Sequence, residues 1–224
     1  GDTWSKEMIA PDELGGGQCS GTLRDGGVII AVGNPKPSTK QTRAPDWDGR
    51  AERSDQPPPD WEKGWFDTQF LRFSDDFRHW QTYTARVYIP NQRVSRMLGE
   101  FGPGWTKGKM IHLPNGHLLS PMAGAFRSDG NERALLVRSS DQGRTWRYHG
   151  TIAYEAKDPN PELPGHYVGC SEPSIALLPN GQMLAMLRKQ WAHYPGEYKP
   201  MSVCWSNDLG KTWTTPTPTK PHLM

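Results

Sequence analysis

The sequence has few of the features that mark several large classes of protein. It holds only three cysteines in 224 residues, Cys19, Cys170 and Cys204, so at most one disulfide can form within it, and no metal-binding spacing is present. It contains no run of 18 apolar residues and hence no segment expected to span a membrane as a helix. Its net charge is only +2. The bulk charge therefore implies no nucleic acid or other polyanion as a partner, and any anion recognition must be local.

Helical periodicity is scarce as well. No stretch with such a pattern is long enough to predict a large helical domain. The chain is rich instead in residues that suit aromatic, turn-rich β structure, with 10 tryptophans and 24 glycines. We therefore expect an all-β protein that uses no metal or other cofactor. A signal peptide would lie upstream of Gly1. The compartment stays open, with a secreted, periplasmic or lumenal location favoured over the cytoplasm.

An internal repeat that ends in tryptophan is the most informative feature of the chain. Residues 139–146 and 206–213 both read Ser-x-Asp-x-Gly-x-Thr-Trp, and they begin 67 residues apart (206 − 139). Residues 74–80 form a shorter copy without the glycine, and residues 1–4 match the second half of a fourth. The tryptophans that end the four copies are Trp4, Trp80, Trp146 and Trp213. A fixed period of this size indicates a repeat architecture.

The repeated motif has the chemistry of a tight turn. The carboxylates of Asp141 and Asp208 can accept hydrogen bonds from backbone N–H groups two or three residues further on. The glycine supplies the positive φ that such a turn needs, and Trp146 and Trp213 are expected to be largely buried. These turns therefore predict a fold and not a catalytic group.

A second repeat runs in phase with the first. Asn115-Gly116 and Asn180-Gly181 each separate two apolar runs, and Asp25-Gly26 is a looser copy. Such dipeptides are the strongest short signal for a β-hairpin. Each unit thus consists of a hairpin, a variable loop, a further strand and the aspartate turn. Four short strands in a unit of this length predict a blade of a β-propeller.

One segment interrupts the pattern. Residues 34–64 are rich in proline and in charged residues, which is typical of a loop and not of a core element. We therefore predict one domain, residues 1–224, with a proline-rich insertion at 34–64. The insertion also accounts for the longer first interval between repeats.

Two ordered sets of motifs resemble those of a known enzyme family. The first is Gly-Pro-Gly at 102–104 and Leu-Pro-Asn-Gly at 113–116, followed by an aspartate turn. The second is Gly-Cys-Ser-Glu-Pro-Ser-Ile at 169–175 and Leu-Pro-Asn-Gly at 178–181, followed by Arg188. In this order they resemble the sialidases, or neuraminidases, whose aspartate turns are known as Asp boxes or BNR repeats. The resemblance implies a six-bladed β-propeller, of which this chain would hold three to four blades.

The resemblance also implies a function and two site residues. Sialidases are glycosidases that hydrolyse terminal sialic acid from glycans by means of a tyrosine nucleophile. By position, Glu172 matches the glutamate that activates this tyrosine, and Arg188 matches one of three arginines that bind the substrate carboxylate. From the residues alone, Glu172 reads as a surface residue near a strand start. Arg188 reads as part of a solvated strand end that continues into Lys189.

Several parts of the family pattern are absent. The first arginine and the acid/base aspartate of sialidases precede the first Asp box, and the third arginine and the tyrosine lie in later blades. We therefore expect an internal excerpt with an incomplete active site. The family often has an aromatic residue shortly after the position of Pro121, but Met122 follows here. Two alternatives stay open. One is a related propeller glycosidase acting on another terminal sugar, and the other is a non-catalytic propeller that binds glycans or proteins.

Overall fold

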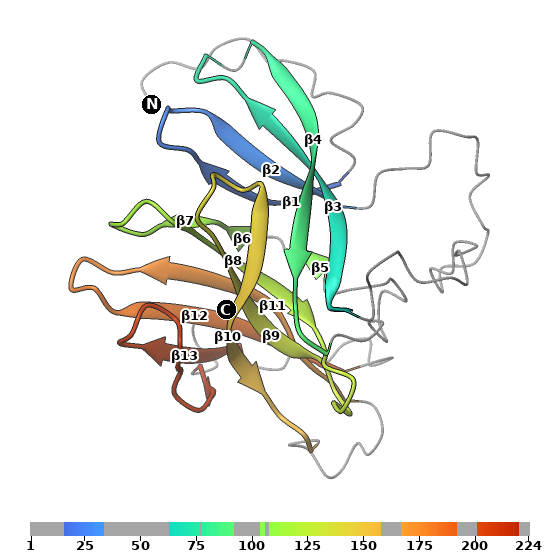
Figure 1. Cartoon of the computed structure of the whole chain (residues 1–224). Coiled ribbons are helices and arrows are strands. Elements are labelled where there is room, and N and C mark those ends of the chain that lie inside the picture. Colours follow the sequence, from blue (N-terminus) through green and yellow to red (C-terminus); the bar gives the residue numbers. More distant parts are fainter. Residues whose placement is uncertain are drawn as a thin grey trace.

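The computed structural model describes residues 16–33, 63–76, 78–91, 104–105, 108–157, 167–191 and 201–219. The described residues form strands and turns and contain no α-helix. The fold is a β-propeller, and the described part holds three blades (Figure 1). Those same residues therefore include no helix that is long and apolar enough to cross a membrane. The predicted insertion falls between two strands of the first blade, with residues 34–62 outside the described residues.

Each blade is an antiparallel unit of about four strands. The first blade contains β1 (Gly16–Thr22), β2 (Val28–Gly33), β3 (Trp65–Phe73) and β4 (Trp80–Tyr88). The second contains β8 (Leu118–Gly124), β9 (Arg133–Ser139) and β10 (Thr145–Tyr154), with an inner edge made of the short pieces β5 (Gly104–Trp105), β6 (Gly108–Lys109) and β7 (Ile111–His112). The third contains β11 (Tyr167–Leu177), β12 (Met183–Trp191), β13 (Ser202–Ser206) and β14 (Thr217–Pro218).

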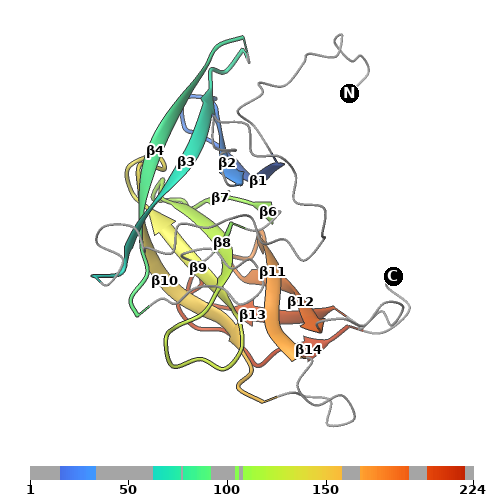
Figure 2. The same cartoon turned by 90° about the vertical axis from the view of Figure 1, so that its right-hand side faces the viewer.

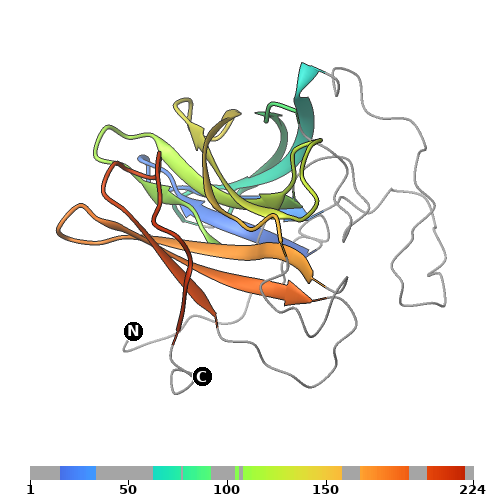
Figure 3. The same cartoon turned by 90° about the horizontal axis from the view of Figure 1, so that it is seen from below.

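The second blade lies between the other two (Figure 2). Short parallel pairings join it to the first blade, between β1 and β6 and between β4 and β10. These pairings merge the first two blades into one ten-stranded sheet, whereas β11–β14 form a separate sheet of four strands. Seen from below, the sheet of the third blade packs against the second blade face to face (Figure 3). Neighbouring blades thus bury their broad faces against each other.

The three predicted hairpins are confirmed, and their turns are built alike. β1 pairs with β2, β7 with β8 and β11 with β12, all antiparallel. At the turns Gly26, Gly116 and Gly181 have φ of 83°, 79° and 81°. The preceding side-chain oxygen, on Asp25, Asn115 or Asn180, accepts a backbone N–H two residues on at 3.0–3.1 Å. Local sequence therefore determines the geometry of these turns.

The two complete Asp boxes form hydrogen bonds within their own turns, as predicted, although the N–H of Thr145 lies four residues beyond Asp141 and not two or three. Asp141 Oδ1 accepts from the Ser139 hydroxyl at 2.7 Å and from the Thr145 N–H at 2.8 Å. The Trp146 indole N–H donates to the carbonyl of Gly143 at 2.9 Å. In the second box the corresponding bonds of Ser206, Thr212 and Trp213 measure 2.8, 2.9 and 3.0 Å. Gly143 and Gly210 carry the expected positive φ. The motif is therefore a folding element in the structure.

The boxes also connect the blades. Trp146 is fully buried and stacks on Phe70 of the first blade with ring centroids 6.1 Å apart. Trp213 packs against the core between the second and third blades and is largely buried, as predicted, although less completely than Trp146. The difference has a structural reason. Trp146 lies in β10, which pairs with β4 of the first blade, whereas Trp213 precedes the next strand and belongs to none.

The apolar core consists mainly of two layers between blades. Adjacent residues of β8 point into different layers, since Leu118 belongs to the layer shared with the first blade and Leu119 to the layer shared with the third. Every residue of β8 is consequently buried, as expected for a strand covered on both faces. The apolar pattern of this strand is therefore continuous and not alternating.

Candidate active site

The β11–β12 hairpin brings the two predicted site residues into contact. Ser171 pairs with Arg188 across the hairpin, which places Glu172 beside it. Arg188 Nη1 donates to Glu172 Oε1 at 3.2 Å. The two side chains are 51% and 54% exposed, respectively, so a ligand can reach both. The contact requires both side chains to lie on one face of the hairpin, but their catalytic and binding roles stay predictions.

The backbone at Glu172 has an unusual conformation. Its φ is 46°, in the left-handed region that glycine favours, and it lies within an irregularity of β11 between Ser171 and Ser174. For a residue other than glycine this conformation costs about 1–2 kcal/mol. An exposed ion pair contributes only about 0–1 kcal/mol. Stability alone therefore does not explain this geometry, and strain of this kind often marks functional sites.

Gly169, three residues before Glu172, lies where the backbones of the second and third blades come close together. Gly169 forms an isolated parallel bridge with Glu132 at the start of β9, and the neighbouring Cys170 N–H donates to the Glu132 carbonyl at 3.1 Å. A Cβ on Gly169 would lie 2.2 Å from that carbonyl oxygen. The first residue of the Gly-Cys-Ser-Glu-Pro motif thus sets how closely the third blade approaches the second.

A buried ion pair next to the site was missed in the sequence. Lys189 Nζ lies 2.7 Å from Glu155 Oε1, with side chains only 11% and 21% exposed. The carbonyl of Glu155 also accepts from the Asn131 side chain at 2.9 Å. Lys189 is therefore not part of a solvated strand end. It ties β12 to the end of β10, and so holds the strand that carries Arg188 against the second blade.

The loop between β8 and β9 is anchored by a second buried group. The guanidinium of Arg133 makes two 2.6 Å hydrogen bonds to the carboxylate of Asp129. Its Cζ lies 4.2 Å from the ring centroids of both Phe126 and Tyr154. A paired and sandwiched guanidinium of this kind fixes a loop firmly. No sequence signal indicated it, because the partners come from both the β8–β9 loop and β10.

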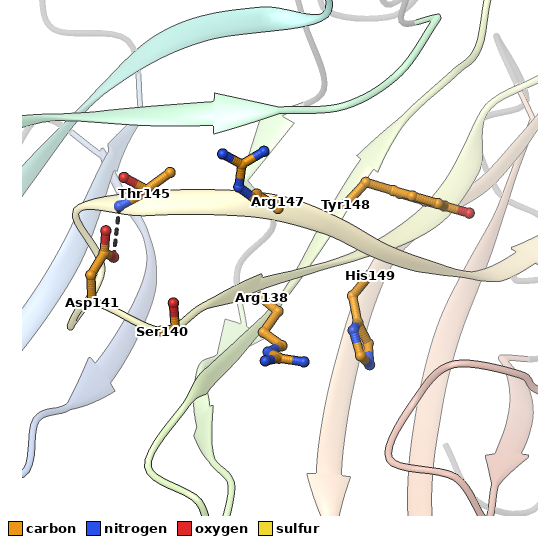
Figure 4. Close-up of a pocket in the computed structure, with 7 residues that line it drawn as sticks. All are labelled: Arg138, Ser140, Asp141, Thr145, Arg147, Tyr148 and His149. Carbon is orange, nitrogen blue, oxygen red and sulfur yellow. Dashed lines mark hydrogen bonds between the residues drawn. The ribbon is translucent and has the colours of Figure 1, made fainter.

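Two concavities of the described residues lie elsewhere. One of about 540 Å³ lies on β9 and β10 and contains Asp141 and His149 (Figure 4). Another of about 460 Å³ surrounds the incomplete Asp box near Trp80. Neither includes Glu172 or Arg188, yet we regard that pair as the candidate catalytic centre, because Asp141 is already engaged in its own turn. Within the described residues no cluster of three or more metal-ligating side chains occurs.

The fold is that of a β-propeller, and it contains two turns of the same Ser-x-Asp-x-Gly-x-Thr-Trp design. The model of the BNR repeat-like domain matches residues 57–222, about three quarters of the sequence. The chain therefore belongs to the BNR repeat-like domain family. A comparison with curated proteins gave no match.

Solved structures with similar folds include glycosidases. A protein of unknown function from Dyadobacter fermentans is 23% identical, with a TM-score of 0.60 over 96% of this chain and 55% of that protein. An α-L-arabinanase from Penicillium chrysogenum is 16% identical, with a TM-score of 0.52 over 92% and 50%. An α-L-arabinofuranosidase from Fusarium graminearum is 14% identical, with a TM-score of 0.52 over 93% and 49%. The chain thus spans about half the length of the structures that it matches.

Proposed function

We propose that the whole protein is an exo-glycosidase that releases a terminal sugar from glycans, and that this sugar is sialic acid. The observation that carries the proposal is the contact between Glu172 and Arg188 on one hairpin, 3.2 Å apart and open to solvent. The resemblance to sialidases assigns a base and a carboxylate-binding arginine to these two positions.

The chemistry of the pair suits an acidic sugar. A guanidinium has five N–H donors in a planar fork that matches a carboxylate. Arg188 donates to Glu172 through Nη1, and its other N–H groups are left as donors for a substrate carboxylate. The exposed carboxylate of Glu172 would accept the proton of a tyrosine hydroxyl, since an unassisted phenol has a pKa near 10 and is a weak nucleophile at neutral pH.

A terminal sugar other than sialic acid is the second candidate, and one observation favours it. The residue after Pro121 is Met122, whose side chain is fully buried in the core. No aromatic side chain is therefore presented to a substrate from this position. The experiment must accordingly compare an acidic with a neutral sugar.

The test is the turnover of the whole protein on a fluorogenic α-sialoside and on a fluorogenic α-L-arabinofuranoside. We expect turnover of the sialoside. Arg188→Lys should raise KM for it about tenfold or more, because a point charge replaces a bidentate fork. Arg78→Lys, at another exposed arginine, is the matched control and should leave KM unchanged. Turnover of the arabinoside alone would favour the second candidate, and turnover of neither would favour a non-catalytic glycan-binding propeller.

A further inference from the structure

The concavity on β9 and β10, hereafter the β9–β10 dish, is a separate feature of the second blade. Its lining residues are Arg138, Ser140, Asp141, Thr145, Arg147, Tyr148 and His149 (Figure 4). Its volume of about 540 Å³ lies within the range of small-ligand sites. It would hold one or two sugar rings.

Two arginines of the dish occupy opposite positions on neighbouring strands. Arg138 of β9 and Arg147 of β10 are directly opposite in the antiparallel register, a position where like charges are destabilising. Figure 4 shows their guanidinium groups turned away from each other. Among the described residues neither has a carboxylate within ion-pair distance. Arg147 is instead held over the ring of Trp65, 4.9 Å from its centroid.

The one carboxylate in the dish does not balance this charge. Asp141 accepts hydrogen bonds from Ser139 and Thr145 inside its own turn. Its pKa is nevertheless lowered, because these hydrogen bonds outweigh the effect of its partial burial. It therefore stays ionised but directed into the turn. The two arginines and this one carboxylate therefore leave the dish with a net positive charge.

The remaining polar groups suit hydroxyl groups of a ligand. His149 Nε2 lies 3.0 Å from the carbonyl oxygen of Leu209 in the third blade. A carbonyl only accepts, so this nitrogen carries the proton and donates. Burial, together with the charges of Arg138 and Lys211, lowers the pKa of His149. The imidazole is thus neutral near pH 7, and its Nδ1 is left as an acceptor.

We propose that the β9–β10 dish binds an acidic sugar, with the carboxylate or sulfate of the sugar between Arg138 and Arg147. The anion would relieve the like-charge pair, and hydroxyl groups of the ring would meet His149 Nδ1 and the hydroxyls of Ser140 and Thr145. A single acidic sugar fits the local charge better than a nucleic acid, since the chain carries a net charge of only +2.

The dish is distinct from the candidate active site. Glu132 bridges to Gly169, close to Glu172, whereas Arg138 lies six residues further along the strand. At a rise of about 3.3 Å per residue this is roughly 20 Å. The proposal therefore concerns an accessory glycan site and does not depend on the catalytic role of Glu172.

Calorimetric titration of the whole protein tests the proposal. The probes are digalacturonic acid, which carries carboxylates, a sulfated heparin-derived disaccharide, neutral lactose and a short oligothymidylate. We expect one or both acidic disaccharides to bind, and which of them binds identifies the anionic group. Lactose should not bind. Arg138→Gln and Arg147→Gln should each weaken binding about tenfold or more, since each removes a charge-assisted hydrogen bond.

The controls separate the dish from the other site. Arg188→Gln should leave the affinity unchanged. If this variant lost binding instead, the ligand would bind at the candidate active site, and the proposal would be overturned. Arg138→Gln should be at least as stable as the wild-type chain without ligand, because it removes the like-charge pair. Unchanged affinity in both dish variants would also overturn the proposal. If oligothymidylate bound through the same arginines more tightly than either disaccharide, the ligand of the dish would be a nucleic acid and not a sugar.

Discussion

Replacing Asp141 by alanine tests the structural role of the Asp boxes. The carboxylate of Asp141 accepts from the Ser139 hydroxyl and from the Thr145 N–H. Ser139 is almost fully buried, and its hydroxyl oxygen also accepts from the Gly143 N–H at 2.9 Å. The turn positions Trp146 in the core between the first two blades. In Asp141→Ala both donors to the carboxylate lose their acceptor.

The size of the effect follows from these two donors. A buried donor left without an acceptor costs about 1–3 kcal/mol. The Thr145 N–H can regain part of this by hydrogen bonding to water, because Thr145 is only partly buried. We therefore expect Asp141→Ala to lower the free energy of unfolding by about 1–3 kcal/mol. For a chain of this size each kcal/mol corresponds to roughly 2–4 °C in Tm.

Urea unfolding followed by tryptophan fluorescence measures this loss. The m-value should not change, because the same surface is exposed on unfolding. Asp76→Ala is the matched control. It removes the corresponding hydrogen bonds in the incomplete box, where the turn is exposed to water, so its effect should be much smaller. If Asp141→Ala abolished turnover of the whole protein while stability stayed unchanged, our structural interpretation of the motif would be wrong.

Three further substitutions probe the turns and the strained site. Leu209 has φ of 57° and is 37% exposed, so Leu209→Asn should raise the free energy of unfolding in urea by about 0.5–1 kcal/mol; a loss would contradict this. The Thr212 hydroxyl and N–H lower the pKa of Asp208 from 3.8 to about 2, so its stabilisation is present above pH 4 and is lost as the pH falls towards 2. Asp208→Asn should flatten this part of the pH–Tm curve, and an unchanged slope would refute the assignment. Glu172→Gly should keep or raise thermal stability by up to about 1 kcal/mol while turnover is lost, whereas a large drop in Tm would show that the ion pair matters for stability.

Much of the fold could be predicted because the deciding interactions are local. Asn115-Gly116 and Asn180-Gly181 determine their turns through a side-chain oxygen two residues away and a glycine with positive φ. The Asp boxes are equally local, since Asp141 bonds within its own turn. The contact between Glu172 and Arg188 followed from the hairpin, because its two strands bring these positions side by side.

The features that sequence reasoning missed depend on contacts between blades. Lys189 is buried because Glu155 reaches it from the second blade. The burial of Trp146 and the partial exposure of Trp213 differ although their motifs are nearly identical, because only the first box continues into a strand that pairs with the preceding blade. The left-handed backbone of Glu172 was also not foreseen, since glutamate has no preference for that region. Long-range packing imposes all three features.

The most direct test of the central claim is the steady-state turnover of a fluorogenic α-sialoside by the Glu172→Gln variant of the whole protein. Glutamine keeps the size of the side chain and removes the base, and it leaves Arg188 in place to bind the substrate carboxylate. We expect kcat to fall by about 10²–10⁴-fold with little change in KM. Wild-type turnover by Glu172→Gln would contradict the role of Glu172, and with it the assignment of this hairpin to the active site.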